Sequence, residues 1–303
     1  MPSSTIEATA SPATLDRALA PRARGASHPA LRQFLRNRVA VGSLVLLVLM
    51  GVVALFAPQL SPYDPTKLSI TSRMLEPSRD HLIGTDQFGR DVFSRLLWGA
   101  RLTVFYAFIA IGIGGGIGIA LGAIAGYGRG WFDAVIMRAM DILLALPGLL
   151  LALVVLTVLG TGLVNAQIAV GVSLIPVYVR LVRGSMLSER EREFVLAAKV
   201  MGCSPSRTLV HHILPSVWSQ VAILSTSALG WAIVIASTLN FLGLGVAPPT
   251  PEWGADLATG REWLTTGWWI CTGPGVAITI VILAINFLGD GLTEALDANL
   301  RQR

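Results

Sequence analysis

Residues 39–57, VAVGSLVLLVLMGVVALFA, carry no charged side chain. A helix needs about 20 mainly apolar residues to cross the hydrocarbon core of a bilayer, and this run meets that length. It starts too late in the chain, and runs too long, to be a cleaved signal peptide, whose apolar region covers about 7 to 15 residues. The stretch therefore predicts a helix that stays in the membrane.

Five further apolar runs follow it, at residues 102–127, 141–160, 163–182, 217–245 and 269–289. The chain as a whole is 53% hydrophobic and 14% charged, whereas about 25% of residues are charged in a soluble domain. We therefore expect an all-α integral membrane protein with six transmembrane helices. Pro147 and Pro176 fall inside expected spans, where each is either a kink or a tolerated irregularity.

The order of the runs predicts a division of the chain. Residues 1–30 are rich in Ala, Ser, Pro and Arg without an apolar period, which is typical of a disordered tail. Residues 31–58 then hold the first transmembrane helix, residues 59–101 an extracytoplasmic segment, and residues 102–303 a core of five helices.

Basic residues give the expected orientation. Five arginines crowd the start of the first span, and the positive-inside rule places them in the cytoplasm: Arg22, Arg24, Arg32, Arg36 and Arg38. Six spans then return the C-terminus to the cytoplasm. The segment 59–101 fits the rule less well, because it also holds several basic residues, among them Arg79, Arg90 and Arg95.

Residues 193–215, EFVLAAKVMGCSPSRTLVHHILP, interrupt this apolar pattern between the fourth and fifth runs. Apolar side chains recur at helical spacing up to Met201, and Gly202 follows where a helix can end in a left-handed turn. Ser204 and Pro205 resemble an N-cap and first helical position, so a second short helix is expected up to Pro215. Such an amphipathic helix-break-helix is suited to docking in a groove on another protein.

Three other interpretations compete with docking. The element could simply pack between spans, or form a DNA-binding helix-turn-helix, although nearby spans and the lack of a basic face disfavour the latter. His211 and His212 could suggest a metal site, but adjacent helical residues point in different directions and no acidic or cysteine partner stands at ligand spacing. Cys203 and Cys271 are expected on opposite sides of the membrane, so no disulfide is expected between them.

Residues 197–215 resemble the EAA loop of ABC importer permeases, with two alanines, a glycine four residues on and a final Leu-Pro. Leu196 replaces the usual Glu and His212 the usual Ile, as in the peptide-transporter branch of that family. Three other stretches resemble the same branch, namely residues 81–101, HLIGTDQFGRDVFSRLLWGAR, residues 239–254, LNFLGLGVAPPTPEWG, and residues 286–301, NFLGDGLTEALDANLR. In the second of them, Asn240 and Ala247 depart from the usual Ser and Gln.

The resemblance implies a type I ABC importer permease fold in the inner membrane of a bacterium. Its implied partners are a second homologous permease, two cytoplasmic ATPases and an extracytoplasmic solute-binding protein, besides membrane lipid; no nucleic acid is expected. Within a coupling loop at 184–216, the implied ATPase-coupling residues are Glu193, Phe194, Ala197, Ala198, Met201, Gly202, Leu214 and Pro215. The implied external motif is Gly84, Thr85, Asp86, Gly89, Arg90 and Asp91.

The loop after the fifth run and the tryptophans before the sixth allow two interpretations. Tryptophans commonly anchor a helix at the membrane interface. Alternatively, this region contacts the binding protein or forms an external gate, and the candidate residues for that role are Pro248, Pro249, Glu252 and Trp253.

The chain carries no phosphate-binding loop of its own. Neither of its two lysines, Lys67 and Lys199, follows a glycine in a G-x4-G-K-[ST] pattern. The expected function is inward translocation of dipeptides, oligopeptides or related solutes such as nickel complexes, with ATP and Mg bound by partner subunits and no catalytic or metal site in this chain. Alternatives are an intramembrane enzyme and an ion-coupled secondary transporter, but no nucleophile-base pair, HExxH or paired Asp lies in the spans.

Two further features of the spans have ordinary explanations. Small residues recur every four positions in IGIGGGIGIALGAIAGYG, residues 111–128, which lets helices approach closely in lipid. The run follows no strand, so a dinucleotide fold is excluded. Four ionisable residues lie at span edges, where snorkelling or capping is favoured over a transport pathway: Arg138, Asp141, Asp290 and Glu294.

Overall fold

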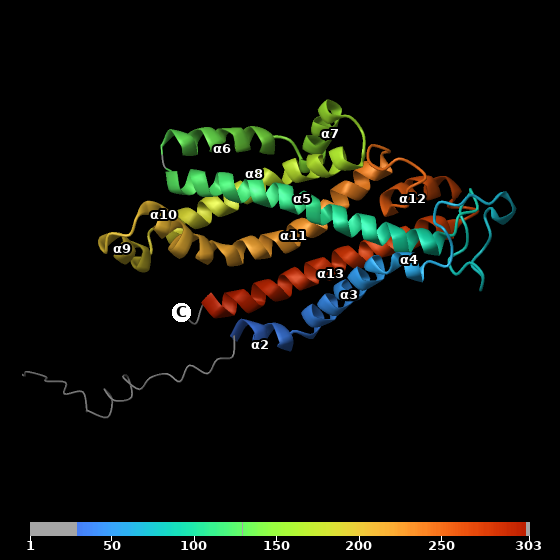
Figure 1. Cartoon of the computed structure of the whole chain (residues 1–303), viewed down its shortest axis with the longest axis horizontal. Helices are drawn as coiled ribbons and strands as arrows, with labels where there is room; N and C mark the ends of the chain where they lie inside the picture. The colour runs from blue at the N-terminus through green and yellow to red at the C-terminus, as the bar shows by residue number, and fades with distance from the viewer. Residues whose placement is uncertain (1–28, 129, 301–303) are drawn as a thin grey trace, which may run out of the picture.

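The computed structural model describes residues 29–128 and 130–300, and these residues form an elongated helical bundle (Figure 1). The expected tail therefore lies outside the described residues, except for Pro29 and Ala30 at the start of the first described helix. In the described ranges only an isolated bridge between Thr85 and Asp91 has β geometry, and all regular elements are helical.

The long helices are α3 (Arg38–Leu55), α5 (Val92–Gly128), α8 (Leu163–Glu189), α11 (Leu214–Phe241) and α13 (Trp268–Leu300). Shorter helices are α2 (Pro29–Arg36), α4 (Ala57–Leu60), α6 (Trp131–Leu144), α7 (Gly148–Leu159), α9 (Glu193–Val200), α10 (Pro205–Thr208) and α12 (Trp253–Gly260). A π-helical turn, η2 (Leu209–Ile213), joins α10 to α11, and 3-10 turns occupy η1 (Ile70–Ser72) and η3 (Arg261–Trp263).

Within residues 29–128 and 130–300, five helices are long and apolar enough to cross a membrane. The third expected span, residues 141–160, is not a single helix as predicted. It is divided between α6 and α7, which meet at an angle of 96°, so the described chain has up to six spans if this bent pair counts as one. Pro147 explains the break, because proline disfavours helical geometry in the residue before it and cannot donate a backbone hydrogen bond. Pro176, by contrast, lies inside the uninterrupted helix α8.

Across the bundle the helices lie in the spatial order α6 and α7 on one side, then α5 with α8, then α11, α13 and α3 (Figure 1). The tightest pair is α5 with α8, where the glycine pattern predicted a close approach. A side chain on Gly122 would stand 2.8 Å from Cβ of Val182, and one on Gly126 would stand 2.6 Å from Cβ of Met186. These glycines allow the two helices to pack almost backbone to backbone.

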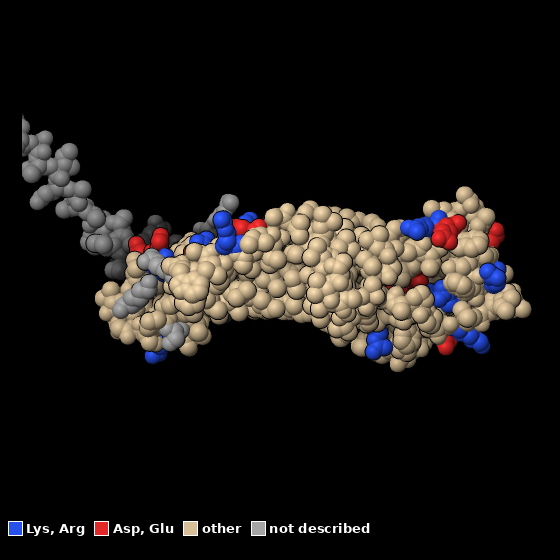
Figure 2. All heavy atoms as spheres, turned by 90° about the horizontal axis from the view of Figure 1, so that it is seen from above, with Lys and Arg blue, Asp and Glu red and all other residues tan. Residues whose placement is uncertain are grey.

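Two ends of the bundle differ in structure. We call the end with α4, α12 and residues 61–91 the loop end, and the opposite end, with α9 and α10, the α9 end (Figure 1). Charged residues gather toward both ends on the face in Figure 2, and an uncharged belt lies between them. That distribution is the one a membrane-spanning bundle requires.

The first span is fixed to the core at the α9 end. The Asn37 side chain caps α3 by accepting hydrogen bonds from the backbone N–H groups of Val39 and Ala40, both at 3.1 Å. Its amide nitrogen donates to Oε2 of Glu294 on α13, at 3.0 Å. Glu294 therefore helps to hold a helix start, in agreement with the structural role expected for an ionisable residue at a span edge.

Candidate functional site

The helix-break-helix between the fourth and fifth runs is present at the α9 end. Helix α9 ends at Val200, and Gly202 has a φ of +82°, which confirms the predicted left-handed turn. The backbone N–H of Cys203 then donates to the carbonyl of Ala198 at 3.1 Å, and α10 begins at Pro205. The hydroxyl of Tyr127, at the end of α5, donates to the Pro205 carbonyl at 3.0 Å and ties the turn to the bundle.

Helix α9 buries one face and exposes an apolar one. Val195 and Ala198 are 0% and 2% exposed, so Ala198, one of the predicted coupling residues, packs inward. Val200 and Met201 are 88% and 77% exposed. We define the α9 face as the exposed apolar side chains Phe194, Leu196, Ala197, Val200 and Met201. Leu196 and Val200 were not among the predicted coupling residues, but both are exposed beside them.

The second half of the element differs from the prediction. The short helix was expected to stop at Pro215, but α10 continues through η2 into α11. Leu214 and Pro215 are the first residues of α11, where a proline is tolerated because the first helical N–H groups have no partner in the helix. Helix α10 is therefore joined directly to a membrane-spanning helix.

The two histidines of this element do not form part of a metal cluster. His211 is exposed and His212 half-buried in η2. Across residues 29–128 and 130–300, no group of three or more His, Cys, Asp or Glu side chains is arranged to hold a metal ion. Cys203 lies at the α9 end and Cys271 near the start of α13 at the loop end, so the two thiols are far apart along the bundle.

The predicted external motif forms a compact turn at the loop end. Gly84 and Gly89 have φ values of +81° and +76°, which glycine adopts without a side-chain clash. The Asp86 carboxylate accepts the backbone N–H groups of Phe88 and Arg90 at 2.8 and 2.9 Å, and pairs with the Arg90 guanidinium at 2.6 Å. Both charged side chains are buried.

The other half of the motif is anchored to the first turn of α5. Thr85 forms the β bridge with Asp91, and its carbonyl accepts the indole N–H of Trp269 on α13 at 3.0 Å. The Asp91 carboxylate accepts the backbone N–H and the hydroxyl of Ser94, both at 2.7 Å, and lies 2.9 Å from Nδ1 of His81. The motif is thus a folded cap on the ends of α5 and α13.

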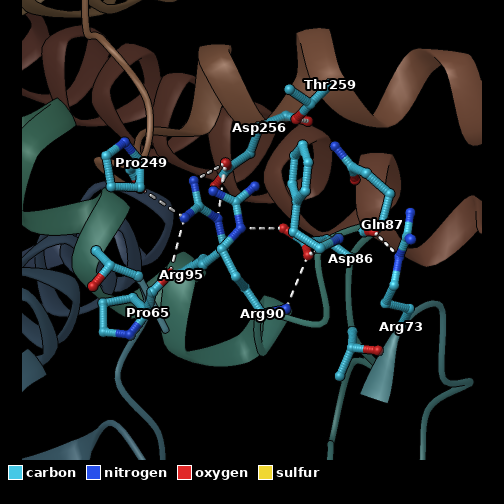
Figure 3. Close-up of polar contacts among 12 residues, drawn as sticks. Pro65, Arg73, Asp86, Gln87, Arg90, Arg95, Pro249, Asp256 and Thr259 are labelled. Carbon is cyan, nitrogen blue, oxygen red and sulfur yellow. Dashed lines mark hydrogen bonds and ion pairs between the residues drawn. The ribbon is translucent and has the colours of Figure 1, made fainter. Parts of the chain in front are cut away.

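Arg95 connects this cap to the loop that follows α11 (Figure 3). Its guanidinium forms a buried ion pair with Asp256 of α12, with 3.0 Å between Nε and Oδ1. It also donates to the carbonyl oxygens of Pro65 at 2.9 Å and Pro249 at 3.0 Å. We call Arg95 with these three partners the Arg95 clasp, and the sequence prediction did not identify it.

The four residues expected at an external gate or a binding-protein contact divide into two pairs. Pro248 and Pro249 are exposed. Glu252 and Trp253 are 2% and 1% exposed, and the indole N–H of Trp253 donates to the carbonyl of Leu96 in α5 at 3.0 Å. In this conformation the second pair therefore holds α12 against α5, and its side chains are not available to another protein.

Glu252 is a buried carboxyl group. Its Oε2 accepts the backbone N–H of Ala255 at 2.9 Å and caps α12, and the Thr103 hydroxyl lies 3.3 Å from its Oε1. Burial raises the pKa of Glu252 from 4.5 to about 7; the nearby charge of Asp256 acts in the same direction, and the hydrogen bonds to the carboxylate oppose the shift. The loop end thus contains a group that titrates near neutral pH.

The fold and this arrangement belong to a known class. Residues 118–302 match the family model of the binding-protein-dependent transport system inner membrane component, and residues 28–77 match that of the N-terminal transmembrane domain of oligopeptide transport permease C. The chain belongs to this family of inner-membrane permease components of ABC importers. These are transport components and not enzymes, so the family supports neither alternative function.

Individual relatives agree with this assignment. The chain is 39% identical over 272 residues to the dipeptide transport system permease protein DppC of Alkalihalophilus pseudofirmus, covering 90% of each chain. It is 40% identical over 271 residues to the glutathione transport system permease protein GsiD of Pectobacterium atrosepticum, covering 89% of this chain and 90% of the relative. An inward-facing structure of the MetNI methionine ABC transporter shares the fold, with a TM-score of 0.55, 18% identity, and coverage of 65% of this chain and 94% of that chain.

Proposed function

We propose that this chain moves dipeptides, oligopeptides or related small solutes inward across the cytoplasmic membrane, as one permease of an importer whose partner subunits hydrolyse ATP. The solute class is supported by relatives at 39% and 40% identity that transport dipeptides and glutathione. ATP and Mg then act on the partners, because this chain has no phosphate-binding loop.

The proposal that this chain is coupled to an ATPase rests on the α9 face. The short helix α9 exposes apolar side chains, with Val200 at 88%, next to the left-handed turn at Gly202. Exposed apolar patches of this kind mark docking sites. We assign the α9 face to contact with a cytoplasmic ATPase subunit, and the continuous helix from α10 to α11 to transmission of the ATPase movement into the membrane.

The remaining partners follow from the same assignment. A second homologous permease would complete the translocation path and dock on a second ATPase, and an extracytoplasmic solute-binding protein would deliver the solute at the loop end. There, the exposed Pro248 and Pro249 are available for contact. The buried Glu252 and Trp253 would act in a gate by holding α12 in place.

The proposal places the α9 end and both termini in the cytoplasm. The five arginines near the start of α3 support this orientation by the positive-inside rule. The last described residues of α13 also lie toward the α9 end (Figure 1). The segment 59–91 is then extracytoplasmic.

Uptake of a labelled dipeptide, in cells with the chain deleted and then restored, tests the function. Restoration of the chain should restore uptake, and equal uptake with and without the chain would overturn the solute class.

Val200→Asp tests coupling. When this variant is present in the membrane at normal abundance, it should lose both uptake and co-purification of the ATPase. Ile70→Asp is the matched control, because Ile70 is 86% exposed but lies at the loop end, and it should retain the ATPase.

A further inference from the structure

An apolar groove opens between α3 and α13 at the loop end. It has a volume of about 600 Å³. Leu46 and Met50 of α3 form one wall, Val276 and Ile280 of α13 form the other, and Leu82 and Trp268 close its top. The same two helices are in direct contact at the α9 end, where Gly291 packs on Ala40, and the groove lies further toward the loop end.

The groove is lined mainly by apolar side chains, and few polar groups face it. The Thr272 hydroxyl in its lining donates to the carbonyl of Trp268 at 2.8 Å, and the indole N–H of Trp269 donates to the carbonyl of Thr85 at 3.0 Å. Apolar cavities without free polar partners stay dry and take up apolar ligands; an engineered cavity of about 150 Å³ binds benzene. A groove of 600 Å³ has room for a much larger apolar group.

The surroundings of the groove identify the occupant. Its walls continue into surfaces that face hydrocarbon in a membrane protein, with Leu49 at 57%, Val276 at 50% and Ile280 at 40% exposed. Along α13 the lining covers residues 268–280, a length of about 18 Å at 1.5 Å per residue. One leaflet of the hydrocarbon core is about 15 Å thick. The groove therefore begins at the membrane interface, where Trp268 is 57% exposed, and runs through the depth of one leaflet.

We propose that this groove binds an acyl chain of a phospholipid from the leaflet at the loop end. The bound chain fills the groove and adds packing contacts to the apolar side chains of α3 and α13 that line it. The lipid then adds to the direct packing of the first span on the core, in which Ala54 and Ala57 are 5% and 0% exposed. This inference rests on the membrane location of the chain and not on its solute or its partners.

Quantitative lipid analysis of the purified full-length chain tests the proposal. Gly273 lines the groove, and a Cβ there would meet its neighbours at 3.6 Å or more, so Gly273→Leu extends a side chain into the groove without a backbone clash. After an extensive detergent wash, wild-type chain should retain a phospholipid that Gly273→Leu loses. Met50→Trp, which fills the groove from α3, should lose the same phospholipid and serves if Gly273→Leu does not fold.

The matched control is Gly116→Leu. Gly116 is an exposed glycine in α5 with no other atom within 4 Å of its Cβ position, and the substitution adds the same side chain outside the groove. It should retain phospholipid like wild type. A photoactivatable acyl chain should also crosslink to the groove residues of α3 and α13 in membranes. Equal phospholipid retention by folded wild-type, Gly273→Leu and Met50→Trp chains would overturn the proposal, as would crosslinking of the groove residues to a protein partner in place of lipid.

Discussion

Gly202 is the residue on which the coupling hypothesis most depends. Its φ of +82° lies in the left-handed region, where a β-branched side chain is disfavoured by roughly 1 to 2 kcal/mol. Gly202→Val should therefore distort the turn next to the α9 face. About 1.4 kcal/mol is a tenfold change in an equilibrium, so we expect at least a several-fold loss of ATPase co-purification and a loss of uptake. Subunit abundance, co-purification and uptake are measured in the same cells.

Gly202→Asn is the control for that substitution. Asparagine adopts the left-handed region more readily than other non-glycine residues, and the Cβ position of Gly202 is open. Gly202→Asn should keep most of the uptake that Gly202→Val loses. Normal uptake by Gly202→Val at wild-type abundance would show that this turn is not part of the coupling element.

Glu252 predicts a pH dependence of stability. Because its pKa rises from 4.5 to about 7 on folding, the folded state binds the proton more tightly than the unfolded state does. Its stabilising contribution is therefore complete below pH 4.5 and is lost as the pH rises through about 7. In detergent, the melting temperature of wild type should fall between pH 5 and 8 more steeply than that of Glu252→Gln, which stays neutral. Glu76→Gln removes an exposed carboxylate and should follow wild type; equal slopes in all three proteins would contradict the assignment.

Individual residues were predictable from the sequence to different degrees. Gly202 and Pro205 have local meaning, because one favours a left-handed turn and the other a helix start, and both roles are found in the structure. The partnership of Arg95 with Asp256 has no local signal, since 161 residues separate them and only the packing of α12 on α5 brings them together. Likewise, the burial of Ala198 depends on which face of α9 meets the bundle.

At the scale of elements, the Arg95 clasp joins the start of α5, the loop after α11 and α12. Removing one partner of a buried ion pair leaves an uncompensated charge and costs about 3–5 kcal/mol. Arg95→Gln should therefore markedly lower the melting temperature of the purified chain. Arg180→Gln is the contrasting variant, because Arg180 and Asp141 pair while 51% and 49% exposed, and such pairs contribute about 0–1 kcal/mol. Similar melting temperatures for both variants would contradict a stabilising role for the clasp.

The limits of prediction for elements are clearest at α6 and α7. Residues 141–160 are apolar enough for one span, and hydropathy alone does not detect that a proline divides them between two helices at 96°. The direction of the bend is set by neighbours: a side chain on Gly148, at the start of α7, would lie 3.7 Å from Trp231 and Ile235 of α11. The same limit explains the misplaced end at Pro215, since proline is compatible with both the end of one helix and the first turn of the next.

At the scale of the whole molecule, composition predicted the membrane location. The structure gives a reason for the basic residues in the segment 59–101, which fits the positive-inside rule less well. Arg90 and Arg95 lie in buried ion pairs with Asp86 and Asp256, so they serve the folded cap of the loop end. The basic residues near α3 have no such role in the described chain: Arg32, Arg36 and Arg38 are exposed. These free arginines therefore provide the better indication of the cytoplasmic side.

That orientation predicts the outcome of cysteine labelling from one side of the membrane. Cys203 and Cys271 are first replaced by serine, and a single cysteine is then introduced as Arg79→Cys or Val200→Cys, both at exposed positions at opposite ends of the bundle. A membrane-impermeant maleimide added to spheroplasts should label position 79, because the proposed orientation places the loop end outside the cytoplasm. Position 200 should react only after the membrane is permeabilised, which also confirms that its thiol is accessible. Labelling of position 200 in intact spheroplasts, with position 79 protected until permeabilisation, would invert the topology and move the α9 face away from any cytoplasmic ATPase.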